Sequence, residues 1–172
     1  MITYCTKCLF PDSKPDLFFD ERGVCIACNN YDDRSGIDWE QRWRELAELL
    51  NRYRKKDGSN WDCIVPVSGG KDSTYQVLRV LELGMNPLCV TSVTCHLSDL
   101  GRRNINNIKN LGVDYVEMSP NPLIRRKLNR IGLTQVGDIS WPEHVGIFTI
   151  PAVLYAWSPP GVNASLILVG TR

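Results

Sequence analysis

A chain of 172 residues with 43% hydrophobic and 23% charged side chains has the composition of a globular protein with one domain, or one domain and a small appendage. Twenty basic and nineteen acidic side chains leave a net charge near +1, which argues against a dedicated nucleic-acid-binding protein. No apolar run approaches the roughly 18 residues that a membrane span needs, and the first residues lack the pattern of a signal peptide. We therefore expect a cytoplasmic protein without a membrane partner, in which the seven cysteines indicate metal binding or catalysis before disulfides.

Residues 1–36 contain two Cys-x2-Cys pairs, Cys5 with Cys8 and Cys25 with Cys28, separated by sixteen residues. Each pair places two thiolates on one tight turn, and two such turns complete a tetrahedral sulfur shell around Zn²⁺. The segment has too little apolar material to fold without a staple of this kind. A closed shell has no open position for water, so we predict a structural, zinc-ribbon-like module. The alternatives are an iron–sulfur cluster and four unligated surface thiols.

Residues 37–60 are predicted to form a linking helix. Asp38 is a candidate N-cap with Gln41 three residues later, which is a capping-box pattern. Apolar residues then recur on one face, and the turn at 57–60 ends the helix. These apolar residues are Trp39, Trp43, Leu46, Leu50 and Tyr53.

From residue 61 to 172, short apolar runs alternate with helical patterns. We predict strands at 63–67, 88–93, 113–118 and 165–169. Helices are expected at 74–83, ended by Gly84, near 105–111, ended by Gly112, and at 123–131 and 143–157. Strands that alternate with helices favour βαβ units, so the predicted fold class is α/β with a doubly wound, mostly parallel sheet.

A glycine-rich loop from Val67 to Ser73 lies between the first of these strands and the next helix, with the sequence Val-Ser-Gly-Gly-Lys-Asp-Ser. Two glycines let the backbone approach an anion, and the helix that follows presents free N–H groups. Ser68 and Ser73 add hydroxyl donors, Lys71 adds a charge, and Asp72 is placed to cap the helix or approach Mg²⁺. The loop therefore predicts phosphate binding by Val67, Ser68, Gly69, Gly70, Asp72 and Ser73, and the alternative is a tight turn with an aspartate cap.

The other polar candidates have two interpretations each. Cys63 and Cys89 fit small core residues, whereas Cys95 ends a strand and is a candidate reactive thiol. His144 is a candidate general base or a capping residue, and His96 follows a strand where doubly wound folds bind ligands. A basic cluster is either a solvated helix face or a contact for the diphosphate of a nucleotide sugar, and comprises Arg125, Arg126, Lys127 and Arg130.

The Ser-Gly-Gly-Lys-Asp-Ser stretch after a strand resembles the signature of the PP-loop ATP pyrophosphatases, which have an adenine nucleotide alpha hydrolase-like fold. The chain as a whole resembles the N-acetyl sugar amidotransferases of surface-polysaccharide biosynthesis, which includes the O-antigen of lipopolysaccharide. The resemblance covers residues 4–157 and is carried by 4–12, 19–28, 68–73, 86–90, Asn104 with 111–114, and 141–147.

The resemblance implies an enzyme that adenylates an acetamido oxygen with Mg·ATP and replaces that oxygen with ammonia. The substrate would be an N-acetylated nucleotide sugar, and a separate glutaminase–synthase pair would supply the ammonia. We expect Lys71, Asp72 and His144 to act in catalysis, and the adenine to lie near Val93 and Thr94. Gly170 is expected to reach the phosphates.

The last residues depart from the family pattern. A Gly-Glu-Asn-like stretch is expected near the active site, where this chain has Gly170-Thr171-Arg172. We therefore expect an incomplete nucleotide-binding domain that binds ATP without completing amidine formation alone. The alternatives are a tRNA sulfur transferase of the PP-loop type and a truncated chain that binds ATP without activity.

Overall fold

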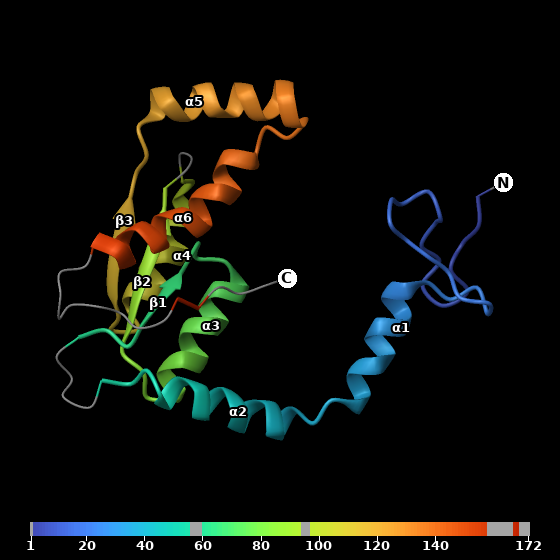
Figure 1. Ribbon diagram of the computed structural model, residues 1–172, viewed down its shortest axis with the longest axis horizontal. Coiled ribbons are helices and arrows are strands. Elements are labelled where there is room, and N and C mark those ends of the chain that lie inside the picture. Colours follow the sequence, from blue (N-terminus) through green and yellow to red (C-terminus); the bar gives the residue numbers. More distant parts are fainter. Residues whose placement is uncertain (1, 56–59, 94–96, 158–166, 169–172) are drawn as a thin grey trace. The chain divides into compact units, whose positions relative to one another are not determined.

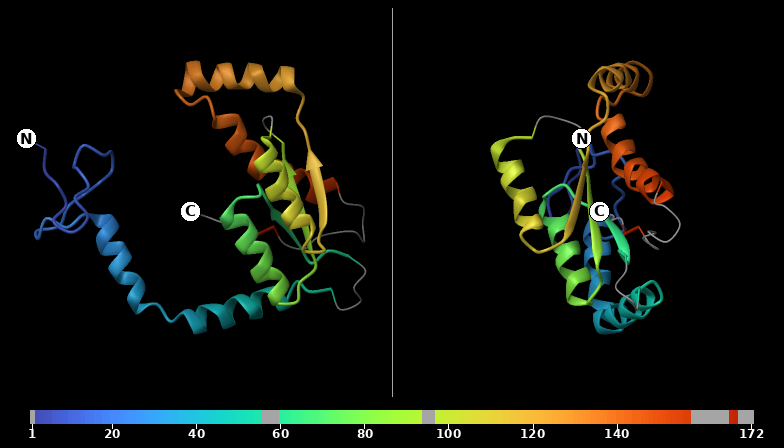
Figure 2. Two further views of the ribbon diagram at one scale, coloured as in Figure 1. Left: turned by 180° about the vertical axis from the view of Figure 1, so that it is seen from behind. Right: turned by 90° about the vertical axis from the view of Figure 1, so that its left-hand side faces the viewer.

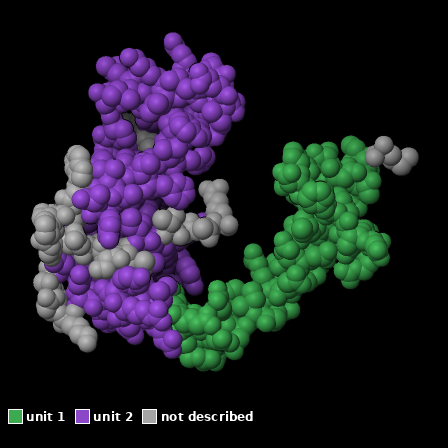
Figure 3. All heavy atoms as spheres, viewed as in Figure 1, with its two compact units in different colours: residues 1–46 green, residues 47–172 purple. Residues whose placement is uncertain are grey.

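The computed structural model (Figure 1) describes residues 2–55, 60–93, 97–157 and 167–168. The chain forms two compact units, Met1–Leu46 and Ala47–Arg172 (Figure 3). The first unit contains the four clustered cysteines, and the second contains the alternating strands and helices. The boundary between the units falls inside helix α2 (Trp39–Asn51), within the segment predicted as a link.

The first unit has little regular structure before its first helix. Antiparallel bridges join Tyr4 to Pro11 and Phe19 to Cys25, and each bridge closes a turn beside a cysteine pair. Helix α1 (Ile26–Asp33) begins directly after Cys25 and continues into a 3₁₀ turn, η1 (Arg34–Gly36). The sequence did not predict α1, because none of its residues is buried and it has no apolar face to reveal it.

Helix α2 begins where the sequence indicated. The Asp38 carboxylate accepts a hydrogen bond from the Gln41 backbone N–H at 2.9 Å. The Gln41 side chain turns instead to Glu45 at 3.0 Å, so only half of the predicted capping box forms. The helix ends at Asn51, with Leu50 buried near its last turn, and so stops before the predicted end at 57–60. The reason is that the N–H groups of Arg52 and Tyr53 donate to carbonyls three residues back, at Leu49 and Leu50.

The second unit is built on a parallel sheet of three strands in the order β1-β2-β3 (Figure 1). These are β1 (Cys63–Pro66), β2 (Pro87–Ser92) and β3 (Asp114–Met118), which confirms the first three predicted strands to within a residue or two. The crossovers are α3 (Lys71–Glu82) and α4 (Asp99–Lys109). Glycines with positive φ follow both helices, Gly84 at +70° and Gly112 at +81°, as predicted.

Helices cover both faces of this sheet. Figure 2 shows α3 and α4 along one face and α6 (Trp141–Trp157) along the other. Since successive strand residues point to opposite faces, Ile64, Leu88 and Val90 share one side, where they pack against Ile150 of α6. The second unit therefore has α/β architecture with a core on each side of the sheet.

The segment between β3 and α6 is more elaborate than its sequence pattern indicates. Helix α5 (Pro122–Ile131) continues into a π-helical turn, η2 (Gly132–Val136), which ends at Gly137 with a φ of +76°. Asn121 caps α5 by accepting the Leu123 N–H at 2.9 Å, and Pro122 occupies the first turn.

Only residues 167 and 168 of the predicted fourth strand, 165–169, are described. Ile167 pairs in parallel with Ile64, and the Leu168 N–H donates to the Ile64 carbonyl at 2.9 Å. Because β2 occupies one side of β1, this pairing lies along the other edge of β1. Among the described helices, none combines the length and apolar character needed to cross a bilayer.

Candidate functional site

The four cysteines of the first unit converge on one point. Their Sγ atoms all lie within 4.8 Å of one another, and those of Cys8 and Cys25 are 3.6 Å apart. A zinc ion with four sulfur ligands at about 2.3 Å requires sulfur–sulfur separations of about 3.8 Å. Cys5 and Cys25 are fully buried. The quartet therefore has the composition and the spacing to hold a zinc ion.

Backbone N–H groups stabilise the thiolate form of Cys5. The Cys5 Sγ accepts hydrogen bonds from the N–H groups of Cys25 at 3.2 Å, Lys7 at 3.4 Å and Cys8 at 3.5 Å. Burial opposes the charge, but the three donors, Cys25 foremost, lower the pKa of Cys5 to about 6. Burial raises the pKa of Cys28 to about 12, so a second thiolate needs a compensating cation.

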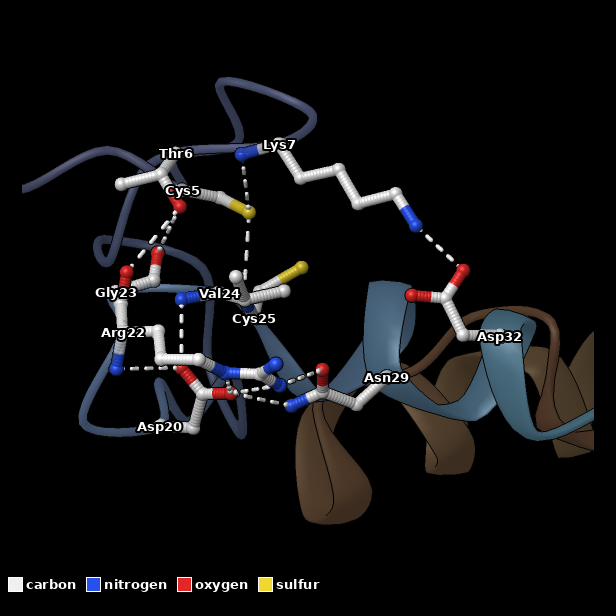
Figure 4. A network of polar contacts seen from close by, with 10 residues as sticks. All are labelled: Cys5, Thr6, Lys7, Asp20, Arg22, Gly23, Val24, Cys25, Asn29 and Asp32. Carbon is white, nitrogen blue, oxygen red and sulfur yellow. Dashed lines mark hydrogen bonds and ion pairs between the residues drawn. The ribbon is translucent and has the colours of Figure 1, made fainter.

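The turn before Cys25 is organised by Asp20 (Figure 4). Its carboxylate accepts the backbone N–H groups of Arg22 and Val24, each at 2.9 Å, and the side-chain amide of Asn29 at 3.1 Å. The Arg22 guanidinium adds a contact at 2.8 Å. The Val24 hydrogen bond, followed by that of Arg22, lowers the pKa of Asp20 to about 2, so the carboxylate stays ionised at neutral pH.

Two further contacts tie the first cysteine turn to the second (Figure 4). Thr6 donates its backbone N–H to the Gly23 carbonyl at 3.0 Å, and Lys7 forms an ion pair with Asp32 of α1. Gly23 has a φ of +72°, and a Cβ there would lie 3.1 Å from the Thr6 methyl group. The two turns are thus fixed by polar contacts and close approach rather than by an apolar core.

The glycine-rich loop leaves the carboxyl end of β1. The Val67 N–H donates to the Val90 carbonyl at 2.8 Å, and the Thr91 hydroxyl donates to the Val67 carbonyl at 2.6 Å. The Ser73 hydroxyl accepts the Ser68 N–H at 3.3 Å and donates to the Gly70 carbonyl at 3.1 Å. These bonds close the loop on itself at the start of α3.

The start of α3 leaves donors available for a ligand. Within the described ranges, no protein acceptor meets the backbone N–H groups of Lys71, Asp72 and Ser73. A groove of about 380 Å³ lies beside them, and its lining comprises Gly69, Lys71, Thr74, Tyr75, Leu78, Asn104 and Asn107. The loop residues were predicted from sequence, whereas Tyr75 and Asn107 were not. Asn104 is one of the residues that carry the family resemblance, whereas the sequence signal for Asn107 is its position three residues later on α4.

The remaining predicted site residues do not all lie at the glycine-rich loop. Lys71 and Asp72 form an ion pair at 2.5 Å, with side chains 89% and 76% exposed. Val93 follows β2 and donates its N–H to the Met118 carbonyl at 2.8 Å, at the same carboxyl edge as the loop. His144 is exposed in the first turn of α6 and makes no hydrogen bond to the loop within the described ranges. Thr94, Cys95, His96 and Gly170 lie outside the described residues.

Cys63 and Cys89 occupy adjacent buried strands. Both are fully buried, and burial raises the pKa of each thiol to about 12. A thiol with so high a pKa is a poor nucleophile near neutrality. Both residues therefore act as small core side chains.

Comparison with known proteins gives a match to an uncharacterized protein. No family model matches the chain. The chain is 24% identical over 151 residues to "Uncharacterized protein MJ1599" of Methanocaldococcus jannaschii, a match that covers 79% of this chain and 54% of the relative. The chain thus spans about half the length of that relative, whose description assigns no activity.

Proposed function

We propose that this chain provides the nucleotide-binding part of an ATP-dependent, AMP-forming amidotransferase that acts on the acetamido group of an N-acetylated nucleotide sugar. The loop from Val67 to Ser73 carries this proposal. It combines a positive φ of +79° at Gly69, N–H groups at the start of α3 that have no partner among the described residues, and an adjacent groove. Backbone donors and a helix dipole arranged in this way favour the phosphates of a nucleotide.

The topology of the second unit supports a doubly wound PP-loop fold. The described strands run β1-β2-β3, and Ile167 pairs along the other edge of β1. The direction of strand addition therefore reverses at β1, and ligands of open α/β sheets bind at the carboxyl ends of strands where such a reversal occurs. The glycine-rich loop follows β1 at that position.

The loop residues have separate roles in this proposal. Gly70 leaves space for the phosphates, because among the described residues only the Ser68 hydroxyl, at 3.4 Å, lies within 4 Å of a Cβ built there. Lys71 exchanges its ion pair with Asp72 for the phosphates, which frees the carboxylate to approach Mg²⁺. The adenine lies beyond β2, near Val93 and Thr94.

The proposed chemistry converts the acetamido oxygen, a poor leaving group, into part of AMP, which is a good one. The acetamido oxygen attacks the α-phosphorus of ATP and pyrophosphate leaves. Ammonia from a glutaminase–synthase pair then adds to the activated carbon, and AMP departs with the former acetamido oxygen. The loop contributes positioning and charge stabilisation. His144 is the proposed base that removes a proton from the attacking ammonia.

The cysteine quartet has a structural role in this proposal. A zinc ion held by Cys5, Cys8, Cys25 and Cys28 would have no open coordination position for substrate or water. It would supply the folding free energy that the small apolar content of the first unit does not.

The test follows the acetamido oxygen. The protein expressed from its complete reading frame is incubated with Mg·ATP, ammonia and N-acetylated nucleotide sugars that carry isotopically labelled acetamido oxygen. The proposal predicts pyrophosphate, an amidino sugar, and AMP that contains the label. Formation of ADP, or unlabelled AMP with an amidino product, would contradict it.

The sulfur-transferase alternative requires a reactive thiol near the loop. Of the cysteines that the structure describes in the second unit, Cys63 and Cys89 are buried with pKa values raised to about 12 by burial. A persulfide carrier needs an accessible thiol with a lowered pKa, and these two thiols are buried with raised pKa values. We therefore favour ammonia over sulfur as the group transferred.

A further inference from the structure

Helix α5 differs from an ordinary amphipathic surface helix because its apolar residues are exposed. Its apolar residues Leu123, Ile124 and Ile131 are 64%, 57% and 44% exposed. Its other side lines a groove of about 730 Å³, and the polar residues there are Arg125, Arg126, Asn129 and Arg130. An amphipathic helix normally turns its apolar side to the protein. Here the half-buried residues of α5 are Arg125 and Asn129, and Arg126 and Arg130 line the groove beside them with their side chains exposed to a ligand.

One of these arginines is part of the framework of the groove. Arg125 forms an ion pair with Glu143 at the start of α6, and their side chains are 23% and 22% exposed. Asn129 donates to the Glu143 carboxylate at 3.0 Å and to the Ile139 carbonyl at 2.7 Å. These contacts fix the connection between η2 and α6 against α5. Glu143 is thus a positioning residue, and it balances the charge of Arg125.

The other two arginines retain their charge for a ligand. Within the part of the chain that the structure describes, neither Arg126 nor Arg130 forms an ion pair, and no acidic side chain lines the groove. The two are four residues apart, so they project from the same side of the helix. Guanidinium groups bind phosphate oxygens in pairs, and the volume of the groove is typical of small-molecule sites.

We propose that this groove binds the diphosphate of the nucleotide-linked acceptor, with Arg126 and Arg130 as its phosphate ligands. The identity of the ligand as the acceptor rests on the proposed function, whereas binding of a diphosphate does not. The apolar side chains of Leu133 and Ile139 complete the lining and can contact the uncharged part of the ligand.

The experiment measures calorimetric binding of inorganic pyrophosphate to the complete chain in a Gly70→Val background. That substitution fills the phosphate space of the glycine-rich loop, so the remaining pyrophosphate site is the groove. Adding Arg126→Gln and Arg130→Gln is expected to weaken binding at least tenfold. The control adds Lys127→Gln, which removes a charge from the same helix outside the groove and is expected to change the affinity less than twofold.

An unchanged affinity in the double-arginine variant, or an equal loss with Lys127→Gln, would overturn the proposal. Circular dichroism checks that α5 remains folded, and glutamine preserves its helix propensity. ATP binding to the chain with and without Gly70→Val is measured in parallel. If Gly70→Val leaves ATP binding intact, the glycine-rich loop assignment fails while the groove assignment still depends on the arginine result.

Discussion

Gly69 and Gly70 are neighbours in the loop, yet the backbone requires only one of them to be glycine. Gly69 has a φ of +79°, and a Cβ there would lie 3.1 Å from both the Asn104 Cβ and the Ile105 backbone nitrogen. Gly70 has a φ of −75°, which any residue can adopt, and space for a Cβ. The backbone therefore requires glycine at position 69, whereas glycine at position 70 would serve to keep the proposed phosphate space open.

This difference predicts a larger loss of stability for one alanine variant than for the other. Gly69→Ala is expected to lower the free energy of unfolding by about 1–3 kcal/mol, because it combines backbone strain with a clash against α4. Gly70→Ala is expected to cost less than about 1 kcal/mol, the usual effect of alanine at a glycine N-cap. Urea denaturation of both variants measures the difference. Equal losses would show that the loop conformation differs from the one described above.

At the scale of helices and strands, the sequence predicts what depends on local pattern. The sequence predicts β1 and β2 because buried parallel strands are continuous apolar runs, and it predicts the helices after them because Gly84 and Gly112 mark their ends. The third strand, β3, contains Asp114 and Glu117 and is only partly buried, so its position directly after Gly112 is the signal for it. The cysteine quartet was found from its spacing.

The features that the sequence missed depend on contacts between distant residues. The Asp20 carboxylate accepts hydrogen bonds from Val24 and Asn29 only once the turn has folded, and no short motif encodes that network. The groove beside the loop is lined by residues of both α3 and α4. Asn107 therefore reaches the groove only because the βαβ crossovers place these two helices side by side. The sequence does not predict the π-helical turn η2, because i→i+5 hydrogen bonding is rare and has no simple residue pattern.

Packing of α6 on the sheet gives a prediction at the same scale. Ile150 contacts the cluster of Ile64, Leu88 and Val90 and is 9% exposed. Ile150→Ala is expected to lower the free energy of unfolding by about 2–5 kcal/mol, through lost apolar burial and the cavity left behind. Phe148→Ala is the control, since Phe148 lies two residues away and is 58% exposed. A loss for Phe148→Ala as large as that for Ile150→Ala would contradict the packing of α6 described above.

At the scale of the whole molecule, the two units are stabilised by different kinds of interaction. The first depends on the cysteine quartet and its polar turns, and the second on apolar cores on both sides of the sheet. Removal of metal with a strong chelator is therefore expected to make residues 2–46 sensitive to protease while the amides of β1, β2 and β3 keep their protection from hydrogen exchange. Mass spectrometry follows both signals in one sample. Unchanged protease resistance of residues 2–46 would show that the first unit does not depend on a bound metal.

The central claim is that the loop from Val67 to Ser73 holds the phosphates of ATP, and calorimetric titration of the chain with Mg·ATP tests it most directly. Gly70→Val places a side chain in the proposed phosphate space, whereas Gly36→Val places one in open space in the first unit and serves as the control. We predict binding to the chain and to the Gly36→Val variant with equal affinity, and at least tenfold weaker binding to the Gly70→Val variant. Equal affinity for all three proteins, or no binding to the unaltered chain, would contradict the claim.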